Sequence, residues 1–177
     1  MFSFDNLDSE TRELMAKELS FDISRGSVFM SHRLLEGREQ LHVSLLEQAL
    51  LQGTPESFAQ AIKNSSLLKT IELRTKNGRQ FPANVPYTAH ETLADGEFNR
   101  FYVRALCLRA IHEGKNEIEV YRAKPVRASR VQSEALSGTF ISCAQLLEDL
   151  RNNIGVDTAL GVPAGPNSGL SVRLKTN

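Results

Sequence analysis

The chain has 177 residues, of which 41% are hydrophobic and 24% are charged. This composition is that of an ordinary globular domain, and it excludes collagen, wholesale disorder and a disulfide-stapled miniprotein. Basic and acidic residues balance at 21 each, which argues against a uniformly basic coat for nucleic-acid binding. No apolar run reaches the roughly 18 residues of a membrane-spanning helix, so we expect a cytoplasmic protein with no membrane partner.

The zero net charge conceals a gradient along the chain. Residues 1–60 hold ten acids and five bases, whereas residues 61–130 hold seven acids and thirteen bases. Such a basic central segment can contact an anionic partner, or the acidic first segment can neutralise it inside the fold. The sequence leaves both interpretations open.

The first third of the chain has the periodicity of α-helices. Asp5 or Asp8 can cap a first helix, and leucines at helical spacing predict a second over roughly 39–52. The run Gly53-Thr54-Pro55 suits the end of that helix and the start of a third. Helices joined by so short a connection pack antiparallel.

Near residue 70 the pattern changes to that of a β-hairpin. Two alternating segments near 70–85 flank Asn77-Gly78, a strong hairpin signal. A two-residue loop would put the two apolar sets on opposite faces, whereas a three-residue loop pairs Leu73 with Phe81 on one face. We therefore predict the three-residue loop, with Pro82 facing outward on a strand that is not central.

The second half of the chain is expected to contain the central helix. A short helix should end at Asp95-Gly96, and the next, 97–113, is apolar around almost its whole circumference. Further predictions are a strand near 117–123, a polar basic loop over 124–138, a helix from Ser142 to near Gly155, and a last strand near 170–174.

These elements predict an α+β fold class. It has a helical N-terminal third and a small, mainly antiparallel sheet packed on the central helix 97–113. We expect this sheet to contain the hairpin near 70–85, the strand near 117–123 and the last strand near 170–174. Residues 1–160 are expected to form a single α+β domain. Residues 161–177 form a Gly/Pro-rich C-terminal stretch that ends in a terminal strand or arm.

Two groups of basic residues are candidates for binding an anion or nucleic acid. Arg100 and Arg104 share one side of the central helix, where a buried cation needs either a carboxylate from the first segment or a bound phosphate. The second group lies in the loop 122–130, which contains no acid and suits contacts to a phosphate backbone. Its cations are Arg122, Lys124, Arg127 and Arg130.

Signals for catalysis or metal binding are few. The histidines lack the spacing of a metal site, so we expect no metal and no cofactor. Cys143 falls in the first turn of a helix, where the dipole lowers a thiol pKa, and it is the one candidate nucleophile. The glycine-rich stretch 161–169 matches no phosphate-binding motif.

Three functional hypotheses follow. The first is a non-enzymatic cytosolic binding or accessory protein whose basic central segment contacts nucleic acid or a partner protein, alone or in an oligomer or larger assembly. The second is a small enzyme that acts on a phosphate-containing substrate through Arg100 and Arg104, or a thiol enzyme using Cys143. The third is a phage or mobile-element accessory protein that binds a host protein.

Overall fold

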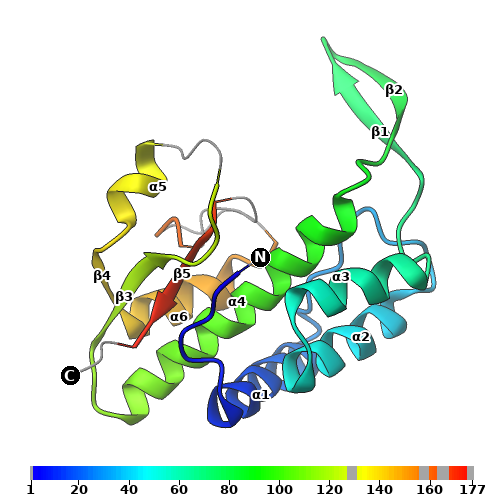
Figure 1. Cartoon of the computed structure of the whole chain (residues 1–177). Coiled ribbons are helices and arrows are strands. Elements are labelled where there is room, and N and C mark those ends of the chain that lie inside the picture. The colour runs from blue at the N-terminus through cyan, green and yellow to red at the C-terminus, as the bar shows by residue number, and fades with distance from the viewer. Residues whose placement is uncertain (1, 127–130, 156–159, 163–167, 175–177) are drawn as a thin grey trace.

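A long central helix organises the fold (Figure 1). The computed structural model describes residues 2–126, 131–155, 160–162 and 168–174. Its elements are α1 (Ser9–Arg25), α2 (Glu39–Gln52), α3 (Pro55–Asn64), β1 (Ile71–Lys76), β2 (Arg79–Asn84), α4 (Ala89–His112), β3 (Glu117–Arg122), α5 (Val131–Leu136), β4 (Phe140–Ser142), α6 (Cys143–Asn152) and β5 (Leu170–Arg173). The predicted α+β class is confirmed, with N-terminal helices, two small antiparallel sheets, and α4 in contact with helices and strands.

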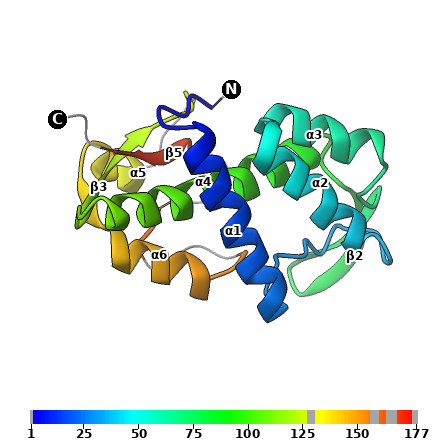
Figure 2. The same cartoon turned by 90° about the horizontal axis from the view of Figure 1, so that it is seen from below.

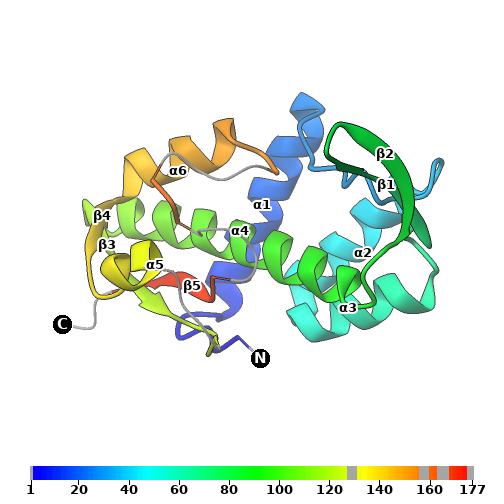
Figure 3. The same cartoon turned by 90° about the horizontal axis from the view of Figure 1, so that it is seen from above.

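The core is built around α4. Figures 2 and 3 show α6 on one side of this helix and strands β3 and β5 on the other, with α1 crossing it. Side chains from several faces of α4, including Phe98, Phe101, Tyr102 and Leu106, are fully buried. The sequence prediction of a central helix over 97–113 is confirmed. No helix in the described part of the chain is long and apolar enough to cross a membrane.

The predicted helix break at Asp95-Gly96 is wrong, because α4 is continuous from Ala89 to His112. A glycine inside a helix costs roughly 1 kcal/mol relative to alanine. Burial of the neighbouring Ala94 and Phe98 against the core outweighs that cost, since each large buried apolar side chain contributes roughly 2 kcal/mol. The Asp95 carboxylate forms an ion pair with Lys124.

The predicted start signals of α1 and α3 are confirmed, whereas Gly53, which ends α2, has an extended φ of −100° and not the left-handed value expected of a glycine there. Asp8 caps α1 by accepting a hydrogen bond from the Thr11 amide at 3.0 Å. Thr54 caps α3 and forms a capping box with Ser57, and Pro55 takes the first helical position. These caps satisfy amides that the helix itself leaves without partners.

The sheet packed beside α4 has three antiparallel strands in the order β4-β3-β5. The predicted strands near 117–123 and 170–174 are confirmed as β3 and β5, which pair with each other. Residues 124–138 do not form a continuous loop as predicted, because 131–136 form α5. Neither α5 nor the three-residue strand β4 has enough residues to display a hydrophobic period.

The predicted hairpin is present, but its three-residue loop is wrong. Lys76 pairs with Arg79, and Leu73 pairs with Pro82, so the loop has only two residues. Asn77 and Gly78 have φ values of 52° and 74°, as a type I′ turn requires. The three-residue prediction assumed that one face of the hairpin is buried.

The hairpin has no buried face, because it projects from the body as an arm (Figure 1). We use "the arm" for residues 71–84. Within its two strands only Glu72 and Ala83 are partly buried, and all other residues are exposed. The arm forms a sheet of its own, separate from the sheet beside α4. Without a core to face, the Asn-Gly turn alone sets its register.

The turn provides a test of the arm's independence. We expect Gly78→Val to destabilise the arm by about 1–2 kcal/mol, since a β-branched residue tolerates positive φ poorly. The arm amides should then show reduced chemical-shift dispersion by NMR, while the melting temperature of the body stays the same. Gln80→Val, at an exposed strand position, is the control and should leave both unchanged. A large fall in global stability with Gly78→Val would contradict the description of the arm as a separate unit.

Candidate functional site: a cationic arm

Arg104 is neutralised inside the protein by two acids of α1. Its Nε donates to Glu18 at 2.7 Å, and its Nη1 and Nη2 donate to Asp22 at 2.6 and 2.8 Å. The Arg104 side chain is fully buried. Burial opposes the charge, but the hydrogen bonds to Asp22 and Glu18 keep the pKa of Arg104 above its ordinary value. The alternative of pairing with the acidic first segment is thus confirmed, and Arg104 has no free donor group facing solvent.

Arg100, the other candidate on α4, is also held internally. Its Nη1 donates to the Asn153 carbonyl at 3.1 Å, and its Nε lies 3.6 Å from Glu97. The second carboxylate oxygen of Glu97 is buried without a hydrogen-bond partner. Burial raises the pKa of Glu97 to about 7, with Asp22 adding to the effect and Arg100 and Arg104 opposing it. The structure therefore brings Arg100 and Arg104 into one buried ion cluster rather than an open anion site.

The predicted basic loop is likewise engaged with the body where it is described. Arg122 donates to the Ser168 carbonyl at 2.8 Å, and Lys124 pairs with Asp95. Arg127 and Arg130 lie outside the described residues. Lys124 is therefore neutralised by an acid, whereas Arg122 is held by carbonyl groups that leave its charge uncompensated.

Cys143 opens α6 as predicted, but its thiol is fully buried. Burial raises the pKa of Cys143, which is the opposite of the shift that activates a nucleophile. Cys107 is also a buried free thiol. Among the described residues, no group of three or more histidine, cysteine, aspartate or glutamate side chains is placed to hold a metal ion.

Within the basic segment 61–130, the cations that remain free lie instead on and beside the arm. In this segment the other described cations of the body have acidic or carbonyl partners, whereas the side chains of Lys63, Lys76 and Arg79 make no hydrogen bond or ion pair with any described residue. Lys76 and Arg79 are exposed at the tip of the arm. The sequence analysis did not single them out.

The two faces of the arm differ in chemistry. Side chains alternate between the faces of each strand, and the register then assigns every residue to one of them. The basic face consists of Glu72, Arg74, Lys76, Arg79, Phe81 and Ala83, and the apolar face consists of Ile71, Leu73, Thr75, Gln80, Pro82 and Asn84. This assignment could have been made from the sequence if the two-residue loop had been chosen.

The tip of the arm carries an unfavourable charge pair. Lys76 and Arg79 lie directly opposite each other, and like charges in that position destabilise a strand pair. No acid of the basic face compensates them, because Glu72 binds Arg33 and Arg74. The Lys76 and Arg79 side chains are thus exposed and have no compensating acid on their face of the arm.

The base of the arm is fixed to the body through Glu72. Arg33 donates to it from the loop before α2 through Nε at 2.6 Å and Nη2 at 3.2 Å, and Arg74 donates from the same strand. Hydrogen bonds from Arg33, and then from Arg74, lower the pKa of Glu72 to about 2. The anchor is therefore present above the ordinary glutamate pKa and is lost only as the pH falls toward 2. It holds the arm throughout the physiological pH range.

Comparison of the chain with protein-family models, curated proteins and solved structures found no match.

The buried ion cluster is tested by removing its arginine. We expect Arg104→Met to cost about 3–5 kcal/mol of unfolding free energy, because Glu18 and Asp22 would remain buried without their main partner. Arg104→Lys should also destabilise, since an ammonium group cannot reproduce the three-nitrogen contact. Urea denaturation of each variant measures the effect. The control is Lys115→Ala, which removes an exposed pair with Glu113. It should lower the free energy of unfolding by about 1 kcal/mol or less. An equally small loss for the Arg104 variants would contradict the structural role of the cluster.

A pH series tests Glu97. Its raised pKa means that the unfolded chain ionises first, so this group lowers stability as the pH rises from about 4.5 to about 7. Glu97→Gln should remove that decline and stabilise the protein at pH 8 by up to about 3 kcal/mol relative to the wild type. The two proteins should have similar stabilities at pH 4. If the stability difference between the variant and the wild type is the same at pH 4 and at pH 8, Glu97 is not the titrating group.

Proposed function

We propose that this protein is a non-enzymatic nucleic-acid-binding protein that contacts its ligand through the arm. The observation that carries the proposal is the uncompensated pair Lys76 and Arg79 at the exposed tip. Arg74 lies on the same face, with its side chain 46% exposed. Positive charge concentrated on a projecting element supports contact with phosphates even where the net charge of the chain is zero.

The shape of the arm favours a duplex as the ligand. A two-stranded β-ribbon fits the major groove of B-form DNA, and six-residue strands extend roughly 20 Å. The basic face can then meet phosphates, while Ile71 and Leu73 on the other face, 56% and 68% exposed, can contact base edges and thymine methyl groups. Phe81, 40% exposed, is the one aromatic residue of the arm, so a stacking platform for single strands is not supported.

The enzymatic alternatives have little support. The phosphate-substrate hypothesis depended on Arg100 and Arg104, and the thiol hypothesis on Cys143; all three side chains are enclosed by the protein's own residues. The free thiols of Cys107 and Cys143 support placing the protein in a reducing cytoplasm. The fold provides no support for the hypothesis of a phage or mobile-element accessory protein.

A partner protein is the second candidate ligand, and the apolar face favours it. Ile71 and Leu73 are large apolar side chains exposed side by side, which is typical of a protein-binding surface. The two candidates differ in their response to salt, because contact through the apolar face does not release counterions. Leu73→Ser should abolish binding to a protein partner, whereas its effect on duplex affinity should be smaller than that of removing Lys76 and Arg79.

The nucleic-acid proposal is tested by charge removal at the tip. We expect Lys76→Ala/Arg79→Ala to weaken binding of a labelled 20-base-pair duplex, measured by fluorescence anisotropy across a salt series. The slope of log K against log salt should fall in magnitude by about 2, since each cation releases about one counterion. The control Lys17→Ala/Lys115→Ala removes the same net charge from α1 and from the end of α4 remote from the arm (Figure 1). It should leave the slope unchanged.

Two results would overturn the proposal. One is the absence of duplex binding by the wild type at low salt. The other is an equal loss of affinity in the tip variant and the control, which would show that net charge alone is responsible and that the arm is not the contact surface.

A further inference from the structure

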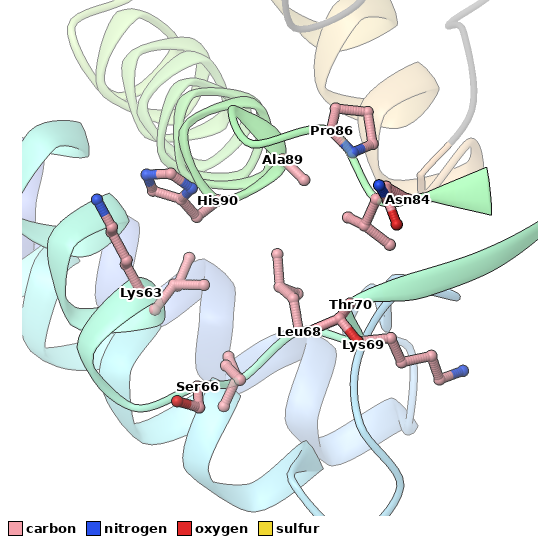
Figure 4. A pocket seen from close by; sticks show the side chains of 12 residues that line it. Lys63, Ser66, Leu68, Lys69, Thr70, Asn84, Pro86, Ala89 and His90 are labelled. Carbon is pink, nitrogen blue, oxygen red and sulfur yellow. The ribbon is translucent and has the colours of Figure 1, made fainter.

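A cavity of about 380 Å³ lies at the base of the arm (Figure 4). It is formed where the segment after α3, the end of β2 and the first turn of α4 meet. This volume is within the range of small-molecule sites. The cavity lining includes Lys63, whose side chain is one of the free cations of the basic segment 61–130.

The ionisable residues that line the cavity are all basic. They are Lys63, Lys69 and His90, and no acid is among the lining residues. Lys69 donates to the His32 carbonyl at 2.9 Å and its chain points away from the cavity in Figure 4. The Lys63 side chain has no hydrogen-bond or ion-pair partner among the described residues. The nearest acid to His90 is Glu91, at 3.9 Å, and its side chain is 60% exposed.

The lining has three chemically distinct parts. Figure 4 shows Lys63 and His90 on one side, Asn84 and Thr70 on the opposite side, and Leu68 and Ala89 between them. The first part can bind an anionic group, helped by the positive end of the α4 dipole, because Thr88 caps that helix without a side-chain hydrogen bond. The middle offers aliphatic surface. The third part offers an amide and a hydroxyl, which can both donate and accept hydrogen bonds.

We propose that this cavity binds one nucleoside monophosphate unit. The phosphate would lie against Lys63 and His90, the base would pack on Leu68, and the base edge would face Asn84. Tyr87, which directly follows the lining residue Pro86, is 89% exposed, so its ring is available next to the cavity for stacking. Other anions that carry an apolar group could also fit this lining. The choice of a nucleotide rests on the proposed function of the arm, and the arm begins and ends at this cavity.

The unit has two possible sources, a free nucleotide or the terminal nucleotide of a strand held by the arm. Titration of the ¹⁵N-labelled full chain with AMP, GMP, CMP and UMP tests the site, with the matching nucleosides and inorganic phosphate as comparison probes. At least one monophosphate should bind about tenfold or more tightly than its nucleoside, since a charge-assisted contact is lost in the nucleoside. Duplexes with a 5′-phosphorylated or a 5′-hydroxyl overhang then separate the two sources.

Variants locate the site and separate this proposal from that of the arm. Lys63→Ala should weaken monophosphate binding about tenfold, and His90→Ala should weaken it as well, whereas Lys17→Ala on α1 should have no effect. The tip variant Lys76→Ala/Arg79→Ala should keep its affinity for the monophosphate while losing affinity for the duplex. If the protein binds the duplex but neither free monophosphates nor the overhang phosphate has any effect, the cavity proposal is wrong while the arm proposal stands. Equal affinity for phosphate and monophosphate, or no effect of Lys63→Ala, would also overturn it.

Discussion

The buried pairing of Arg104 with Glu18 and Asp22 is the interaction on which the rest of the structure depends. It joins α4 to α1 in the middle of the core, and Arg151 from α6 donates to the same Glu18. Charges this deeply buried are tolerated only when their partners are in place. Three helices are thereby fixed relative to one another, and the direction of α4 determines where the arm leaves the body.

The same interaction explains how a neutral chain can present a positive surface. Acids of the first segment neutralise cations of the middle segment, as Glu18 and Asp22 do for Arg104 and as Asp8 does for Arg109. Among the described residues of the basic segment, the cationic side chains without any hydrogen bond or ion pair lie on the arm and beside its base. The cations of the basic segment therefore form two groups. One group is paired within the fold, and the other is exposed and is the contact surface that we propose.

The sequence was sufficient for most of the helical structure and for the fold class. Caps such as Asp8 and Thr54 are local signals, and the apolar circumference of α4 is visible in any window of its sequence. The continuous path of α4 through Gly96 could not be predicted, because burial of the neighbouring turns decides it. The turn at Asn77-Gly78 was misjudged for the opposite reason, since a buried face was assumed where the arm has none.

The candidate site was the part least accessible to sequence reasoning. Arg100 and Arg104 carry the right charge, but only their distances to Glu18, Asp22 and Asn153 show that they are engaged. Lys76 and Arg79 are ordinary exposed residues in sequence and become notable once the register places them opposite each other. Which cations are free is a property of the fold and not of the composition.

Mapping a bound duplex onto the backbone amides by NMR tests the central idea most directly. If the arm is the contact surface, chemical-shift changes will be confined to residues 71–84 and to the cavity at its base, and they will vanish at high salt. Changes centred on Arg122 and Lys124, with the arm unaffected, would contradict the account.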